Sequence, residues 1–221
     1  LRVLISVALV FVSFGFLSKA QCLQGARAGD GSVFLDWSGD RQYVAACYND
    51  ITPLYSGRGL DEPGFPYAYS WVEGDLTRYL EYPVLAGLFQ WLTGTLSRLT
   101  YPLLELTGLA VPEASWFFAL TALLMSGLWV LTIRLVADLA GHRIWDTVLV
   151  AASPLVVVHA FTNWDIPSIT LAVAGMHAAS RSRYGLAGLW IGLGTAFKLW
   201  PLYLLGAYLV LAIRDRRYAH F

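Results

Sequence analysis

Apolar runs recur along most of this chain and limit the folds open to it. They fall at residues 3–20, 84–97, 99–111, 116–136, 145–161, 166–179, 186–197 and 200–213. Several are shorter than the roughly 20 residues that a straight helix needs to cross a bilayer. Hydrophobic residues make up 57% of the chain and charged residues only 14%, unlike a soluble domain. The sequence therefore predicts an all-α polytopic membrane protein.

Basic residues occupy the breaks between the apolar runs. These residues include Arg98, Arg134, His142, Arg143, Arg181, Arg183 and Arg214. Cytoplasmic loops of membrane proteins are rich in Lys and Arg, so we expect these breaks to be cytoplasmic and the eight runs to alternate across the membrane. The run 99–111 contains Pro102 and Glu105, so it is either a membrane crossing or a re-entrant or interfacial piece. The second possibility leaves six or seven crossings.

Three regions follow from this pattern. Residues 1–20 are expected to form a first transmembrane helix, 21–83 an extracytoplasmic loop with interfacial helices, and 84–221 a transmembrane bundle. The first run resembles the core of a signal peptide, but no convincing cleavage site follows it, so we expect an uncleaved helix. Because the chain starts without Met and stops after an apolar run, we expect it to continue beyond both ends.

The long polar segment carries many aromatic residues among its charges, which predicts a folded structure lying against the membrane. Residues 44–51 and 76–80 are candidates for short amphipathic helices at the interface. Cys22 and Cys47 are the only cysteines. On the expected topology both are extracytoplasmic, where a disulfide is one reading and two unpaired thiols the other.

Among the carboxylates of this segment, Asp50 and Glu81 stand out because each has apolar and aromatic neighbours. Partial burial there raises the pKa of a carboxyl toward that of a useful base. A base beside a cation at a membrane surface fits sugar transfer from a lipid-linked phosphate. The bond between sugar and phosphate breaks without an acid that protonates the leaving group. One carboxylate would take the proton from the attacking hydroxyl, and Arg58 or Lys198 would hold the departing phosphate.

Two further charged residues lie beside helix breaks. Lys198 is flanked by apolar residues and followed by Pro201, and a charge at membrane depth is usually functional. The other interpretation of Lys198 is that its side chain snorkels from the end of a short helix to the membrane surface. Asp165 precedes Ile166-Pro167, so the sequence favours a helix cap over a chemical role for it.

The order of these residues matches a known pattern. Asp50 follows the first helix, Tyr55 comes a few residues later, then Pro66-Tyr67, then Tyr82-Pro83 at the start of the next helix, and Lys198 with Pro201 in a later apolar run. In this order the chain resembles the GT-C glycosyltransferases of family 87, which include actinobacterial mannosyltransferases that use polyprenyl phosphate mannose. It departs from many relatives in having Val84 where they have a second Pro, and in its long acidic loop.

This resemblance implies a GT-C helical bundle with a groove for the lipid tail, in the cell membrane with the active face extracytoplasmic. Asp50 would be the catalytic base. Arg58, Tyr55, Glu81, Tyr82, Asp165 and Lys198 would bind the substrates. The donor would be a polyprenyl phosphate sugar, with mannose expected, and the acceptor a lipid or a glycan among the membrane lipids.

Composition and spacing limit other partners and functions. Equal numbers of acidic and basic residues, 15 of each, give no sign of nucleic-acid binding. The four histidines do not cluster, so we expect no cofactor and no metal site, while a divalent cation stays open. The competing functions are a transporter or flippase, which should show paired helix breaks in two related halves, and a non-catalytic scaffold of envelope assembly.

Overall fold

The computed structural model describes residues 1–214; residues 215–221, the end of the expected bundle, lie outside the described part. The elements of the bundle region are helices. They are α1 (Arg2–Lys19), α4 (Val84–Glu105), α5 (Glu113–Ala140), α6 (Val148–Ala151), α7 (Pro154–His159), α8 (Ile166–Ser180), α9 (Tyr184–Phe197) and α10 (Tyr203–Arg214). Short 3-10 helices are η1 (Ala20–Leu23), η3 (Gly141–Thr147) and η4 (Trp200–Leu202).

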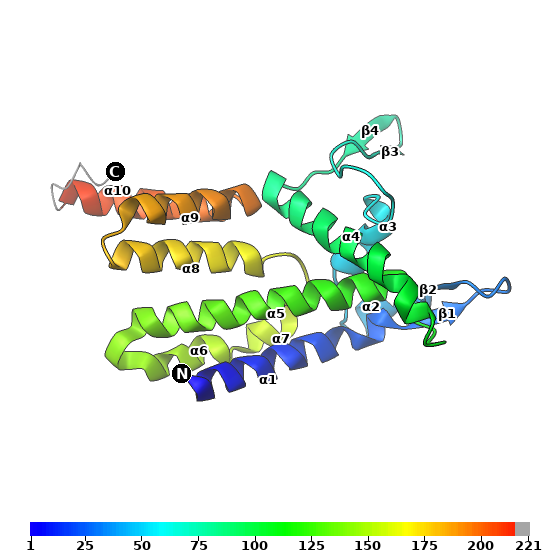
Figure 1. Cartoon of the computed structure of the whole chain (residues 1–221), viewed down its shortest axis with the longest axis horizontal. Coiled ribbons are helices and arrows are strands. Elements are labelled where there is room, and N and C mark those ends of the chain that lie inside the picture. The colour runs from blue at the N-terminus through cyan, green and yellow to red at the C-terminus, as the bar shows by residue number, and fades with distance from the viewer. Residues whose placement is uncertain (215–221) are drawn as a thin grey trace.

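The helices α1, α5, α8 and α9 lie side by side along the long axis of the molecule (Figure 1). The N-terminus and the end of α10 lie at one end of this bundle, and the small hairpins lie at the other (Figure 1). Helix α1 packs against α5 and α7, and α8 packs between α5 and α9. The chain therefore runs back and forth along the axis after α5.

The packing of α1 follows from its sequence. Leu4, Ala8 and Val12 recur every four residues and are buried, so they form the face that contacts the neighbouring helices. Gly15 continues this face, and a Cβ atom there would lie 3.0 Å from the carbonyl oxygen of Val156 in α7. The small residue thus lets α1 and α7 approach closely, as in many membrane helix pairs.

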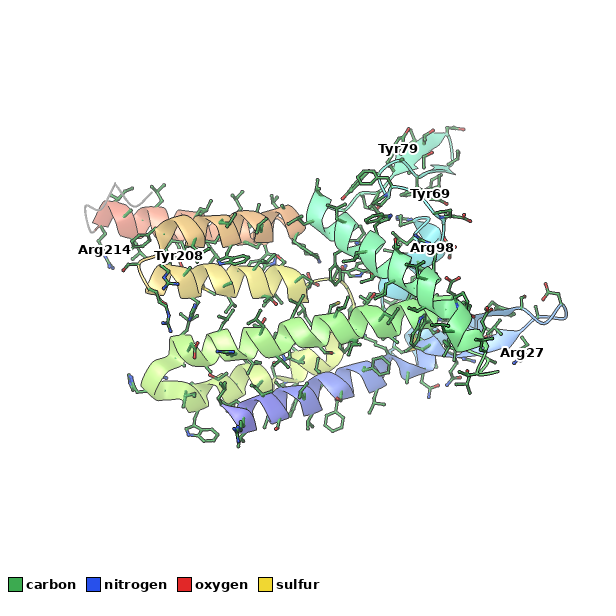
Figure 2. All side chains as sticks on the ribbon, viewed as in Figure 1. Arg27, Tyr69, Tyr79, Arg98, Tyr208 and Arg214 are labelled. Atoms are coloured by element: carbon green, nitrogen blue, oxygen red, sulfur yellow. A yellow bond between two sulfur atoms is a disulfide. The ribbon has the colours of Figure 1, made fainter. Side chains whose placement is uncertain are left out.

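Helix α4 corrects the expected topology. Runs 84–97 and 99–111 were expected to be separated by a cytoplasmic break at Arg98, but one helix continues from Val84 to Glu105. It lies obliquely at the hairpin end of the bundle, and Figure 2 shows Arg98 toward that end and Arg214 at the opposite end. The Arg98 guanidinium donates to the carbonyl of Leu60, in the polar segment. A hydrogen-bond partner 38 residues away in the sequence, and not cytoplasmic solvent, therefore accounts for this charge.

The run 145–161 was expected to be one element, and the structure divides it. Residues 148–151 and 154–159 form the separate helices α6 and α7. Ser153 has an extended backbone and its hydroxyl accepts a hydrogen bond from the Leu155 amide, while Pro154 occupies the first turn of α7. Because proline disfavours a helical conformation in the residue before it, Ser153-Pro154 ends one helix and starts the next.

Residues 21–83, here called the polar segment, contain the strands of the described chain. The two antiparallel hairpins are β1 (Gly25–Arg27) with β2 (Val33–Leu35) and β3 (Ser70–Glu73) with β4 (Leu76–Tyr79). Short helices η2 (Ser38–Asp40), α2 (Arg41–Val44) and α3 (Ile51–Gly57) lie between them. The fold is thus mainly α, with small β elements that an all-α prediction lacked.

Both predicted interfacial helices were wrong. Residues 76–80 form mainly strand β4, because Gly74 takes a φ of 62° in the two-residue turn after β3 and so closes a tight hairpin. Residues 44–51 form mainly a turn between α2 and α3, in which Ala46 has a φ of 51°. Such a φ for a residue with a Cβ interrupts a helix.

A disulfide joins Cys22, in η1 directly after α1, to Cys47 in this turn. The Trp37 indole donates to the Cys22 carbonyl at 2.9 Å, which ties a third part of the polar segment to the same point. These links hold the segment against the first helix. They place the residues that follow Cys47, including Asp50, at a defined position beside the bundle.

Two helical stretches of the described chain are long and apolar enough to cross a membrane, Arg2–Leu23 and Glu113–Ala151. Shorter apolar helices span Ile166–Ser180, Tyr184–Phe197 and Trp200–Arg214. Many large apolar side chains on these elements are exposed, among them Leu17, Leu123, Leu149, Leu189 and Val210. The surface is therefore apolar where a soluble bundle would be polar.

Candidate functional site

Asp50 lies at the hairpin end of the bundle, immediately before α3. Its carboxylate accepts two hydrogen bonds from neutral groups: the Tyr48 hydroxyl at 2.6 Å and the Asn163 side-chain amide at 2.8 Å. Its backbone amide donates to the Thr162 carbonyl at 2.8 Å. The turn between α7 and α8, far away in sequence, thus fixes the backbone and the side chain of Asp50 together.

Tyr82 belongs to the same group of residues. Its pKa is raised to about 12, mainly by burial and then by the negative charges of Asp50 and Glu81, partly offset by Asn163 and Arg58. Its ring packs edge-on against Trp164, with the ring centroids 5.4 Å apart. Tyr82 is therefore a protonated phenol at neutral pH, next to two carboxylates.

Arg58 pairs with Glu81 and not with Asp50. Its Nε and Nη2 donate to the Glu81 carboxylate over 2.7 to 3.1 Å, and its guanidinium lies 4.1 Å from the centre of the Trp71 ring. The expected rise in the Glu81 pKa was wrong. Burial alone would raise that pKa, but the hydrogen bonds and charge of Arg58 outweigh it and leave the pKa below its usual value.

Lys198 and Asp165 form a second ion pair, in which the Lys198 ammonium donates to the Asp165 carboxylate. Asp165 stands at the N-cap position of α8 and Pro167 in the first turn, as predicted, but the Asp165 side chain caps no backbone amide. The cation of Lys198 takes that carboxylate instead. Lys198 itself has an extended backbone at the end of α9, which marks the expected interruption of the helix.

The tripeptide Asn163-Trp164-Asp165 connects the two parts of the site. Asn163 contacts Asp50, Trp164 packs against Tyr82, and Asp165 holds Lys198. Trp164 is completely buried, which fixes the tripeptide relative to the core. A single short turn therefore brings Asp50, Tyr82 and Lys198 to one end of the molecule.

A large apolar groove begins close to this turn. It has a volume of about 580 Å³ and lies among α4, α5, α8 and α9. Phe89, Pro167 and Phe197 line it, and the last two are near neighbours in sequence of Asp165 and Lys198. Farther along, its lining includes Leu131, Leu135, His177, Arg181 and Arg183. The groove can hold an extended hydrocarbon chain whose polar end lies near Lys198.

Tyr55 lies in different surroundings from the residues around Asp50. It is 2% exposed, its ring stacks on Phe117 at 4.6 Å, and its hydroxyl donates to Glu113 at 2.7 Å. Burial and this hydrogen bond raise the pKa of Tyr55. The contacts join α3 to the first turn of α5, so they support the position of the polar segment.

Sequence reasoning missed three residues that hold Asp50 in place. Tyr48 and Asn163 bind its carboxylate, while Lys19 is 3% exposed and donates to the Tyr48 carbonyl at 2.9 Å and to Thr162 Oγ1 at 3.2 Å. Lys19 had a signal in the sequence, because it was the one basic residue at the outer end of its expected helix. Asn163 had none beyond its place in a polar break.

Within residues 1–214, no group of three or more His, Cys, Asp or Glu side chains is arranged to hold a metal ion. The carboxylates described above are instead engaged by hydroxyl, amide, guanidinium or ammonium groups. The arrangement offers one carboxylate held by neutral donors, flanked by two ion pairs and an apolar groove. This set of groups can accept a proton and bind an anionic lipid.

The comparisons with known proteins identify the family. A model of glycosyltransferase family 87 matches residues 79–221, which is more than half of the chain. The match includes Glu81, Tyr82, Asp165 and Lys198 but begins after Asp50. No curated protein and no solved structure matches the chain. The chain thus belongs to glycosyltransferase family 87 and is a sugar-transferring enzyme.

Proposed function

We propose that the chain moves a sugar, mannose in our assignment, from a polyprenyl phosphate donor to an acceptor at the outer face of the cell membrane, with Asp50 as general base. The observation that carries this proposal is the position of Asp50. Its carboxylate is half-buried, has only neutral hydrogen-bond donors and lies beside Tyr82, in a chain of a glycosyltransferase family.

In the proposed step, an acceptor hydroxyl attacks the anomeric carbon of the donor sugar. A new C–O bond forms, the bond from that carbon to the phosphate oxygen breaks, and the bonding electrons leave with polyprenyl phosphate. The acceptor hydroxyl first replaces the Tyr48 hydroxyl as the hydrogen-bond partner of Asp50, and Asp50 then takes its proton. No acid is needed, because a phosphate leaves as a stable anion.

Lys198 is a better candidate than Arg58 for binding the donor phosphate. Arg58 uses three of its nitrogen atoms on Glu81 and on its neighbour Gly57, whereas the described contacts of Lys198 occupy one of its three N–H donors. The groove next to Phe197 would then hold the lipid chain. Asp165 would fix the ammonium in the absence of donor and share it when the phosphate binds.

The proposed orientation rests on the charges at one end of the bundle. Figure 1 shows the start of α1, the end of α5 and the turn between α8 and α9 at the same end of the bundle. Arg2 begins α1, Arg134 lies in the last turns of α5, Arg143 lies in η3, and Arg181 and Arg183 lie between α8 and α9, so we assign this end to the cytoplasm. The polar segment and the disulfide then lie on the opposite, oxidising side. In this proposal Asp50 lies outside the cytoplasm and the protein is multi-pass.

The test is sugar transfer by the full-length protein in membranes supplied with radiolabelled polyprenyl phosphate mannose. Asp50→Asn should lower the rate by about 100-fold or more, because it removes the base while keeping the shape of the side chain. Asp61→Asn is the matched control, since Asp61 is a half-buried carboxylate of the same segment without contacts to Asp50. Its rate should stay near that of the wild type.

Equal rates in wild type and Asp50→Asn would remove Asp50 from the mechanism and leave the family assignment intact. Donor binding without any transfer, in the wild type as well, would favour a transporter or a scaffold. We also propose that no cofactor takes part. Addition of EDTA should then leave the wild-type rate unchanged, and a loss restored by Mg²⁺ or Mn²⁺ would contradict that part of the proposal.

A further inference from the structure

The polar segment exposes a pair of stacked tyrosine rings beside Asp50. The rings of Tyr43 and Tyr48 are nearly parallel, at 10°, with centroids 6.0 Å apart, and the Trp37 ring lies 6.4 Å from that of Tyr48. Tyr43 is 67% exposed and Tyr48 is 40% exposed. The Tyr48 hydroxyl reaches the Asp50 carboxylate at 2.6 Å. An open aromatic surface therefore adjoins the proposed base.

The backbone that carries these rings is held firmly. The disulfide at Cys47 fixes the turn, and the Tyr48 amide donates to the Gln42 carbonyl at 3.0 Å. Ala46 sits in the left-handed region with a φ of 51°, which costs about 1 kcal/mol for a residue with a Cβ. Strained, cross-linked backbone that presents exposed rings is typical of a preorganised binding surface.

The chemistry of this surface fits a sugar ring. One face of a sugar presents C–H groups that pack on the electron-rich face of a tyrosine, and its hydroxyls remain free for hydrogen bonds. A sugar on Tyr43 and Tyr48 would have hydroxyls within the reach of Asp50, where the Tyr48 hydroxyl now lies. A hydrocarbon acceptor would need the apolar groove, which lies on the other side of the Asn163–Asp165 turn, at Pro167 and Phe197.

We infer that Tyr43 and Tyr48 form an acceptor subsite that binds a sugar ring, so the acceptor is a glycan. This inference rests on the proposed function and names the acceptor class for the same site. Tyr43 is a binding residue in this scheme and takes no part in proton transfer. Tyr48 both supports the sugar and holds Asp50 until the acceptor hydroxyl arrives.

The experiment measures transfer from polyprenyl phosphate mannose by the full-length protein in detergent. Two acceptors are compared, octyl dimannoside and phosphatidylinositol, the second representing a lipid acceptor without a glycan. We expect transfer to the dimannoside. Tyr43→Ala should raise the KM for it about fivefold, with kcat and the donor KM little changed, and Tyr43→Phe should restore the KM because the ring is kept.

Phe34→Ala is the matched control. Phe34 is 50% exposed on strand β2 of the same segment, so it would respond like Tyr43 if the rings merely anchored the segment at the membrane surface. Its KM should equal that of the wild type. Wild-type transfer only to phosphatidylinositol, or an unchanged KM in Tyr43→Ala, would overturn the subsite and leave the proposed function standing.

Absence of transfer from this donor to either acceptor by the wild type would instead count against the proposed function itself. A rise in KM with Phe34→Ala as large as that with Tyr43→Ala would assign both rings to anchoring and would also overturn the subsite. Thermal unfolding of each variant checks that the KM values come from folded protein.

Discussion

The surroundings of Asp50 and those of Glu81 and Asp165 differ, although all three carboxylates lie at the same end of the molecule. Asp50 is held by a hydroxyl and an amide, while Glu81 and Asp165 are each held by a cation. Among residues 1–214, no Lys or Arg lies within ion-pair distance of Asp50. A cation favours the charged form of a carboxylate, and Arg58 has this effect on the pKa of Glu81, which makes Glu81 a poor base.

This difference separates two roles within one site. The neutral donors around Asp50 orient the carboxylate and can be replaced by a substrate hydroxyl without the separation of opposite charges. The ion pairs fix the cations that a phosphate would meet. The Arg58 pair ties the end of α3 to β3 and to the residues before α4, and the Lys198 pair ties α9 to the start of α8. Single substitutions can convert one environment into the other.

The largest effect is expected from a cation placed beside Asp50. Asn163→Lys would give that carboxylate the kind of partner that Glu81 has, and we expect kcat/KM to fall about 100-fold. The acidic limb of the pH profile should move to lower pH, because a neighbouring cation lowers the proton affinity of the base.

Asn163→Met separates charge from geometry, because it removes the amide donor without adding a cation. Its rate should fall less, and the acidic limb of its pH profile should not move to lower pH, because loss of the amide hydrogen bond no longer favours the charged carboxylate. If Asn163→Lys retained the wild-type rate, or if both variants shared one pH profile, the absence of a cation near Asp50 would have no part in the mechanism.

A smaller effect is expected at the Lys198–Asp165 pair. Lys198→Met removes the cation that we assign to the donor phosphate, and the KM for polyprenyl phosphate mannose should rise about tenfold. Lys198→Arg keeps the charge and should recover part of the loss. The measurement is the initial rate at varied donor concentration, with the acceptor KM as the internal control.

An equal rise in the donor KM for Asp165→Asn and for Lys198→Met would show that the ion pair, and not the free ammonium, matters for the donor. A lysine that only snorkels to the membrane surface would leave the donor KM unchanged in both variants.

The sequence predicts the bundle better than the polar segment. Apolar runs such as 116–136 and 166–179 form helices because their side chains are apolar over a long stretch, a property that needs no partner. The prediction of a break at Arg98 was wrong, because the carbonyl of Leu60, in a distant part of the chain, accepts a hydrogen bond from that side chain. Hydropathy alone does not register such a tertiary partner.

The candidate site shows the same limit. Asp50 and Lys198 were found from local patterns, but the partner of each comes from the 163–165 turn, and Arg58 binds Glu81 from 23 residues away. The roles of Tyr48 and Lys19 are seen only in the contacts that they make in the folded chain. Residue types that carry chemistry can be read from a single sequence, whereas their pairing depends on the folded chain.

The smallest effect is expected at the Arg58–Glu81 pair. Because hydrogen bonds from Arg58 keep the Glu81 pKa below its usual value, the pair contributes stability above the unfolded pKa of about 4.3 and loses it as pH falls through the folded pKa. The Glu81 side chain is half-exposed, so Glu81→Gln should cost less than about 1 kcal/mol at neutral pH. The variant should also lose less stability than the wild type between about pH 5 and pH 3.

Thermal unfolding of both proteins in the same detergent at neutral and acidic pH measures this difference. Transfer by Glu81→Gln should remain within a few-fold of the wild type, because the carboxylate that accepts the proton is untouched. A loss as large as that expected for Asp50→Asn would reverse the assignment of roles, since Glu81 would then act as a base in spite of its cation.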